Sequence, residues 1–169
     1  MKAIVYTSNT GFTARYAEIL GRQTGLEVWE LSEAVKKLPK GTQIVYLGWL
    51  FASNVKGYRK AAKRFRIRAV CGVGLCETGC LLQEVRKAIS LPEQTPLFTL
   101  QGGMDHSKLK GINKFMISML QKMLAKNQNP TEDDKRMMEL VKNGGDYVSP
   151  AHTAAFMQWY GEAENKNTC

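Results

Sequence analysis

A run of small hydroxyl and amide residues follows the first apolar segment of the chain. The apolar residues AIVY occupy 3–6, and SNTGFT follows at 8–13, where an amphipathic helical pattern begins. Backbone N–H groups at the start of a helix, the positive end of its dipole and nearby hydroxyls would together bind a phosphate. Gly11 would let the backbone approach that phosphate closely. The residue types at 8–13 therefore predict a phosphate site, although a capped helix start without a ligand would use the same residues.

Two common phosphate-binding motifs are absent from this loop. The sequence has neither the GK[ST] triplet of a P-loop nor the GxGxxG fingerprint of a dinucleotide site. No Lys or Arg lies within 8–13. A phosphate would therefore be bound here without a salt bridge from the turn itself.

The elements that would position this loop alternate along the chain. Apolar runs of strand length lie at 3–6, 26–31, 42–50, 68–75 and 95–100. Helix-like stretches lie between them, at 13–21, 32–38, 56–66 and 77–89. Most of the apolar runs are continuous rather than alternating, which is typical of strands covered on both faces. The pattern predicts an α/β domain with a parallel sheet and helices on both faces.

The segment IVYTSNTGFTARYAEIL, residues 4–20, resembles the N-terminal signature of the flavodoxin family. That signature is an aliphatic pair, an aromatic residue, Ser or Thr, a small residue, Thr, and Ala on the helix. Three later pieces resemble the branch that includes menaquinone-dependent protoporphyrinogen oxidase. They are QGGM at 101–104, KFMISMLQKM at 114–123 and DYVSPAHTAAFMQW at 146–159.

By this resemblance the fold is flavodoxin-like, with a five-stranded parallel sheet of strand order 2-1-3-4-5, and the cofactor is FMN. The residues that would wrap the phosphate are Ser8, Asn9, Thr10, Gly11, Phe12 and Thr13. The isoalloxazine ring would lie at the ends of the third and fourth strands. The residues there are Trp49, Leu50, Phe51, Ala52, Ser53, Gly72, Val73, Gly74 and Leu75. Ordinary core packing is the alternative for Trp49 and Phe51.

The resemblance implies an FMN-dependent oxidoreductase that passes electrons between a reduced donor and a quinone-like acceptor. The segment at 104–114 is short where the oxidase family has a long aromatic and basic insertion, so a porphyrin substrate and a quinone reductase activity both stay open. The residue types single out no catalytic acid or base. Two non-enzymatic alternatives are an electron-transfer shuttle that docks a redox partner protein and a scaffold that has lost its cofactor.

Composition and charge bound the remaining possibilities. The chain has 169 residues, of which 44% are hydrophobic, and its formal net charge is +9. This length predicts one domain over 1–163, followed by a tail at 164–169 that frays. With no signal-peptide core and no membrane-length apolar run, we expect a cytoplasmic protein. The positive charge favours an anionic partner, and by itself does not choose among cofactor, protein, membrane and nucleic acid.

Two basic segments have alternative interpretations. The residues at 56–68 interleave aromatics with Lys and Arg, as a nucleic-acid surface does, but we favour the solvated face of a helix and expect no nucleic-acid partner. At 108–126, apolar residues recur three or four apart with lysines between them. We expect this helix to pack its apolar stripe on the sheet, and peripheral contact with an anionic membrane is the alternative.

Three cysteines, Cys71, Cys76 and Cys80, lie at and beyond the end of the fourth apolar run. A metal or iron–sulfur site would require a fourth clustered ligand and tighter C-x-x-C spacing, so we expect no metal. Reduced thiols with a core or incidental role are expected, and thiol chemistry beside a flavin is the alternative. His106 is expected in a solvated loop.

Overall fold

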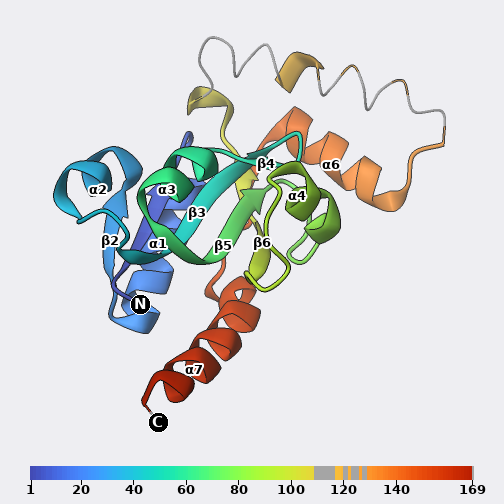
Figure 1. Cartoon of the computed structure of the whole chain (residues 1–169). Coiled ribbons are helices and arrows are strands. Elements are labelled where there is room, and N and C mark those ends of the chain that lie inside the picture. The colour runs from blue at the N-terminus through green and yellow to red at the C-terminus, as the bar shows by residue number, and fades with distance from the viewer. Residues whose placement is uncertain (109–116, 120–121, 123–125, 127–128, 169) are drawn as a thin grey trace.

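A mostly parallel β-sheet lies at the centre of the computed structural model, which describes residues 1–108, 117–119, 122, 126 and 129–168 (Figure 1). Its parallel strands are β1 (Ala3–Thr7), β2 (Glu27–Glu30), β3 (Gln43–Phe51), β5 (Arg66–Gly74) and β6 (Leu97–Gln101). They lie in the order β2-β1-β3-β5-β6. After β1 the chain forms β2 on one side of β1 and then β3 on its other side. A crevice therefore opens between the ends of β1 and β3. The predicted α/β class with a parallel sheet is confirmed.

One short strand interrupts the parallel pattern. β4 (Asn54–Val55) folds back from β3 and pairs with it antiparallel, with Leu50 opposite Val55. The prediction of five strands, all parallel, is therefore wrong, because the sheet has six strands. The turn between β3 and β4 is made by Ala52 and Ser53, with φ angles of 46° and 59° in the left-handed region. Such turns usually carry Gly or Asn, so the sequence did not signal this hairpin.

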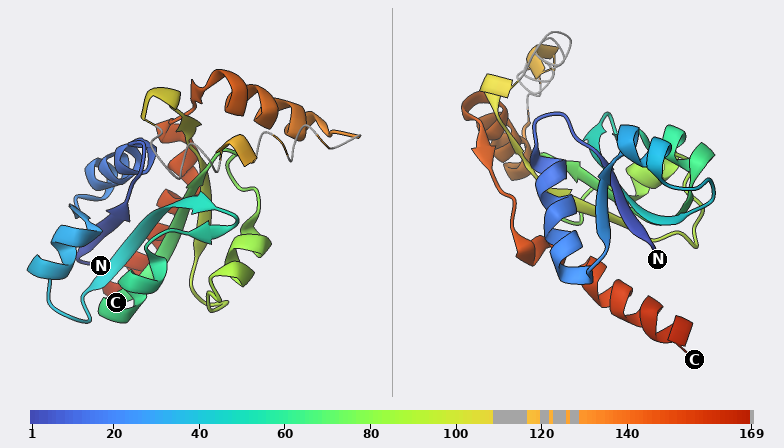
Figure 2. Two further views of the ribbon diagram at one scale, coloured as in Figure 1. Left: turned by 90° about the horizontal axis from the view of Figure 1, so that it is seen from above. Right: turned by 90° about the vertical axis from the view of Figure 1, so that its left-hand side faces the viewer.

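Helices cover both faces of the sheet, as expected (Figure 2). One face is covered by α1 (Phe12–Thr24) and α7 (Ala154–Thr168), and the other by α2 (Leu31–Lys37), α3 (Tyr58–Arg64) and α4 (Leu82–Ala88). Alternating residues of β3 divide the core between the two faces. Val45 and Leu47 pack in one cluster with Tyr16 of α1. Ile44 and Tyr46 pack in the other, on the side of α3.

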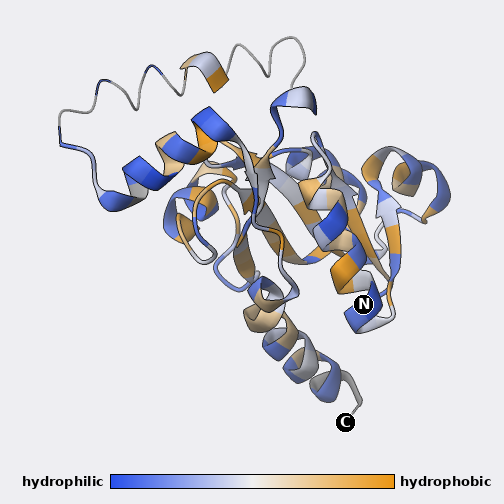
Figure 3. Cartoon of the chain, turned by 180° about the vertical axis from the view of Figure 1, so that it is seen from behind, coloured by the Kyte–Doolittle hydropathy of each residue, from blue (hydrophilic) through white to orange (hydrophobic). Residues whose placement is uncertain are grey.

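A smaller layer lies beyond the carboxyl ends of the strands (Figure 1). It contains η1 (His106–Lys108), α6 (Glu132–Asn143) and an antiparallel pair of β7 (Gly103–Met104) and β8 (Gly145–Asp146). A short 3-10 helix, η2 (Pro150–Thr153), leads into α7. Figure 3 shows hydrophilic residues along most of α6. Its apolar residues Leu140 and Val141 are buried against Met104, which fixes this layer to the end of the sheet.

Several predicted helix bounds differ from the structure. The predicted helix 77–89 is a turn up to residue 81, and only Leu82–Ala88 is helical. The tail 164–169, predicted to fray, is helical through Thr168, and the amino group of Met1 forms an ion pair with Glu164 at 3.5 Å. Most of the predicted basic helix 108–126 lies outside the described residues. In the part of the chain described, we find no helix with the length and apolar character needed to cross a membrane.

Candidate functional site

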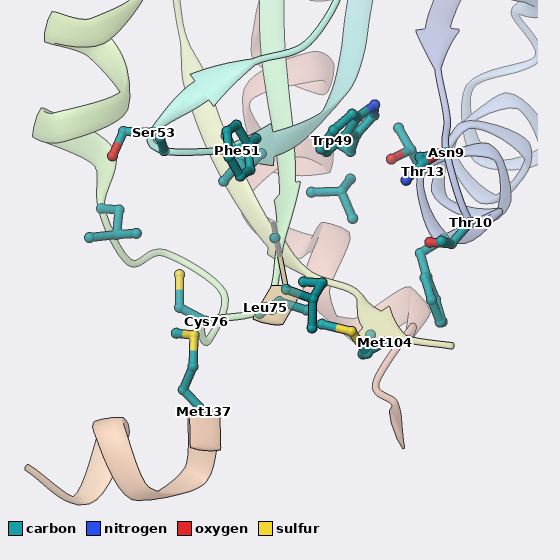
Figure 4. Close-up of a pocket in the computed structure, with 18 of the residues that line it drawn as sticks. Asn9, Thr10, Thr13, Trp49, Phe51, Ser53, Leu75, Cys76, Met104 and Met137 are labelled. Carbon is teal, nitrogen blue, oxygen red and sulfur yellow. The ribbon is translucent and has the colours of Figure 1, made fainter. Parts of the chain in front are cut away.

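A cavity of about 870 Å³ lies at the carboxyl ends of β1, β3 and β5 (Figure 4). One side is formed by Asn9, Thr10 and Thr13 from the loop after β1 and the start of α1. The smaller layer contributes Met104 and Met137 to the lining. Its volume is within the range of about 300–1,000 Å³ that is typical of small-molecule and cofactor sites.

The loop after β1 presents a helix start to this cavity. Gly11 is the N-cap of α1 and has a φ of 100°, a conformation that a residue with a β-carbon rarely adopts. Its N–H group donates a hydrogen bond to Oγ of Ser8 at 3.2 Å, which closes the loop. As glycine has no side chain to cap the first turn, the N–H groups there have no side-chain acceptor from the N-cap.

A lysine from another part of the chain supplies positive charge to this loop. Nζ of Lys108, in η1, lies 4.0 Å from the position that a β-carbon on Gly11 would occupy. Lys108 also forms an ion pair with Asp105 at 3.3 Å. The hydroxyl of Ser107 donates to the Asp105 carboxylate and lowers its pKa, and Lys108 lowers it further. Residues 8–13 contain no cation, and Lys108 could not be predicted at this loop because it is distant along the chain.

Aromatic side chains at the end of β3 form another wall of the cavity. The rings of Trp49 and Phe51 lie 6.2 Å apart between centroids, and Phe51 is 37% exposed. Nζ of Lys56 lies 5.5 Å from the centroid of the Trp49 ring and 5.1 Å from that of Phe51. Both aromatics are therefore at the surface of the site with a cation beside them, rather than enclosed in the core.

The end of β5 lies between these two walls. Val73, Gly74 and Leu75 line the cavity, whereas Gly72 does not. Gly72 is paired with Gly48 on one side and Thr99 on the other, in the interior of the sheet. A β-carbon on Gly72 would come within 2.8 Å of the Leu50 side chain, so this glycine makes room for packing rather than for a ligand.

Another wall of the cavity is apolar and comes mainly from the smaller layer. Met104 of β7 is buried, and Met137 of α6 packs partly buried against the same cluster as Leu75. Phe12 lies across Gly103, where a β-carbon would meet its ring at 2.7 Å. The glycines of the QGGM segment thus allow the start of α1 to pack on this layer.

The predicted site residues are largely brought together. All of them except Ser8, Gly11 and Gly72 line the cavity. The cavity also has lining residues that were not predicted as site residues: Cys76, Leu81, Gly103, Met104, Asp105, Ile117, Met119, Lys122, Lys126 and Met137. Of these, Gly103, Met104 and Met137 belong to the smaller layer, whose position depends on packing between segments far apart in sequence.

The cysteines differ from the expectation of reduced thiols. Cys76 and Cys80 are joined by a disulfide, whereas Cys71 is free and buried in β5. The Cα atoms of the pair lie 6.4 Å apart, within the range that a disulfide spans, and the turn at 77–81 lies where a helix was predicted. Burial raises the pKa of the Cys71 thiol. No group of His, Cys, Asp and Glu among the described residues could hold a metal ion.

The two histidines are also placed. His106 is an exposed residue of η1 and is not among the cavity-lining residues. Nδ1 of His152 lies 2.7 Å from the hydroxyl of Tyr16, at the junction of α1 with η2. This histidine ties two elements together at a distance from the cavity.

Comparison of the chain with protein-family models, with curated proteins and with solved structures gives no significant match.

Proposed function

We propose that this chain is a flavodoxin-like protein that binds one FMN and acts as an oxidoreductase between a reduced donor and a quinone-like acceptor. The observation that carries the proposal is the cavity that joins the loop after β1 to the ends of β3 and β5. A phosphorylated flat ring system requires a helix start, aromatic side chains and nearby backbone from three neighbouring strands.

The FMN phosphate fits the end of the cavity at Thr10 and α1. Gly11 begins α1 with a positive φ, and the first-turn N–H groups have no side-chain acceptor from this N-cap. The Lys108 ammonium group lies close enough to Gly11 to balance part of the phosphate charge. This end therefore offers both hydrogen-bond donors and positive charge.

The isoalloxazine ring fits between the aromatic pair Trp49 and Phe51 and the end of β5. Trp49 offers a face for stacking, and the backbone at Gly74 and Leu75 lies beside the space where the polar edge of the ring would be. When bound, FMN supplies the electron and hydride chemistry, and the protein supplies position and electrostatics. The positive charge of Lys56 beside both aromatics favours electron density on a bound ring.

The apolar wall formed by Met104, Ile117 and Met137 supports an apolar acceptor. Leu75 packs against the same cluster. Thioether side chains adapt to flat apolar molecules without a fixed shape. A quinone-like molecule would therefore bind against the methionines and next to the flavin.

An electron-transfer shuttle is the second candidate, and the net charge of +9 favours it. A basic surface would attract an acidic redox partner over a distance. A shuttle would accept electrons without catalysing steady turnover of a small molecule.

Flavin binding to the full-length chain tests the proposal. We expect FMN to bind with a shifted absorption spectrum, more tightly than riboflavin, because riboflavin lacks the phosphate. Thr10→Glu should abolish FMN binding through repulsion of the phosphate. Ser32→Glu adds the same charge at an exposed position on α2 and should not abolish binding. Unchanged FMN affinity in Thr10→Glu would show that the phosphate site is misplaced. Steady reduction of a soluble quinone by the loaded protein distinguishes the oxidoreductase from the shuttle.

A further inference from the structure

A disulfide lies at the edge of the cavity, in the turn between β5 and α4. Cys76 directly follows Leu75, and both residues line the cavity. The disulfide joins Cys76 to Cys80. Both cysteines are partly exposed, in contrast to the buried Cys71. The bond is therefore within reach of molecules in the cavity and of solvent.

The turn that carries the disulfide is held in place by other bonds. The N–H group of Gly79 donates to the carbonyl of Thr99 at 3.0 Å, and Oγ1 of Thr99 donates to the carbonyl of Cys80 at 2.7 Å. Oγ1 of Thr78 accepts from the N–H group of Gln101 at 3.0 Å. These bonds anchor the turn to β6 whether or not the two sulfurs are joined. Opening of the disulfide would thus leave the turn in position.

The disulfide also closes a very short loop, with a sequence separation of 4. A cross-link between residues so close in sequence removes little conformational freedom from the unfolded chain, compared with one that closes a long loop. Stabilisation of the fold is therefore a weak reason for this bond. Its position at the cavity is the more informative feature.

We propose that Cys76 and Cys80 form a redox-active pair that exchanges two electrons with the flavin in the cavity, an inference that rests on the proposed function. In the reductive direction, the S–S bond breaks and one S–H bond forms on each sulfur. The electron pair comes from the reduced flavin, which becomes oxidised, and the two protons come from the reduced flavin and from solvent. The resulting dithiol can pass the pair to a disulfide substrate by thiol–disulfide exchange.

An anaerobic titration of the FMN-loaded protein with dithionite tests this proposal. The wild-type protein should consume four electrons per chain, two for the flavin and two for the disulfide. Cys76→Ser/Cys80→Ser should consume two, and Cys71→Ala, which removes the buried thiol, should still consume four. Alkylation and mass spectrometry of the wild-type protein before and after the titration should show two new thiols at Cys76 and Cys80. This second readout does not depend on any variant.

The outcomes separate the two proposals. A wild-type protein that binds FMN, consumes only two electrons and keeps the same alkylation pattern would overturn the redox role of the cysteines and leave the flavin site intact. A protein that does not bind FMN would overturn the proposed function, and it would also overturn the electron exchange between the cysteines and the flavin.

Discussion

Gly57 packs so closely against the hydroxyl of Tyr46 that no β-carbon would fit between them. The Tyr46 hydroxyl donates to the carbonyl of Lys56 at 2.7 Å and lies 2.9 Å from Oγ1 of Thr7. This one buried group therefore connects the end of β1, the middle of β3 and the segment that leads into α3. Gly57 makes the arrangement possible because it also has a φ of 81°.

Replacement of Gly57 by Ala should destabilise the fold more than the same change at Gly41. Both glycines have a φ of 81°, but a β-carbon on Gly41 would meet nothing within 4 Å. Gly41→Ala should therefore cost only the strain of the left-handed backbone, about 1–2 kcal/mol. Gly57→Ala should cost about 1–3 kcal/mol more, because the added carbon displaces Tyr46. Urea denaturation measures both, and equal losses would contradict the packing described.

The hydroxyl of Tyr16 should contribute to the attachment of the C-terminal segment. It donates to the carbonyl of Gln101, lies 2.7 Å from Nδ1 of His152 and accepts from the N–H group of Ser149 at 3.3 Å. Tyr16→Phe should lower the free energy of unfolding by about 1–3 kcal/mol, because its partners are left unsatisfied. Tyr58→Phe, at a partly exposed site on α3, is the matched control and should change it little.

Stability should fall in alkaline solution. Burial raises the pKa of Tyr46, and burial likewise raises the pKa of the Cys71 thiol. A raised pKa in the folded state gives stability that is fully present below the unfolded pKa, which is 9.0 for Cys71 and 10.0 for Tyr46. As the pH rises above these values, the unfolded chain loses protons that the folded protein keeps. Each group should then reduce the unfolding free energy by about 1.4 kcal/mol per pH unit.

Chemical denaturation between pH 8 and about pH 11 measures this decline. Above pH 10, the unfolding free energy of Tyr46→Phe should fall less steeply with pH than that of the wild-type protein, because about one fewer proton is released on unfolding. Its stability at neutral pH should nevertheless be lower than that of the wild type. A decline of the same steepness in Tyr46→Phe would show that Tyr46 titrates freely in the folded protein.

Lys108 should contribute to FMN affinity through the phosphate. Its side chain is 60% exposed and also forms an ion pair with Asp105. Its contribution to FMN binding should therefore be that of an exposed ion pair. Lys108→Gln should weaken FMN binding by about 0.5–1 kcal/mol, roughly two- to fivefold in Kd, with a smaller effect at high salt. Riboflavin binding should not change. Lys87→Gln, on exposed α4, removes the same charge elsewhere and should leave both affinities unaltered.

The alternation of strands and helices could be predicted from the sequence. A strand that is buried on both faces has a continuous apolar run, and a helix that is buried on one face has helical periodicity, so both patterns are local. The capping box of Thr131 and Asp134 at the start of α6 is a similarly local interaction. The segment at 8–13 was identified as a turn into a helix for the same reason. These features depend on interactions between residues a few positions apart, and they are therefore readable without the fold.

The tertiary structure alone decided which distant residues share the site. The hairpin at Ala52 and Ser53 has left-handed residues without Gly or Asn, and the pairing of β4 with β3 selects this conformation. The disulfide between Cys76 and Cys80 depends on the anchoring of their turn to β6. Lys108 approaches Gly11 because the layer after β6 packs on the end of the sheet. Each of these features depends on the free energy of burying segments that are far apart in the chain. That free energy cannot be predicted from a local pattern of residue types.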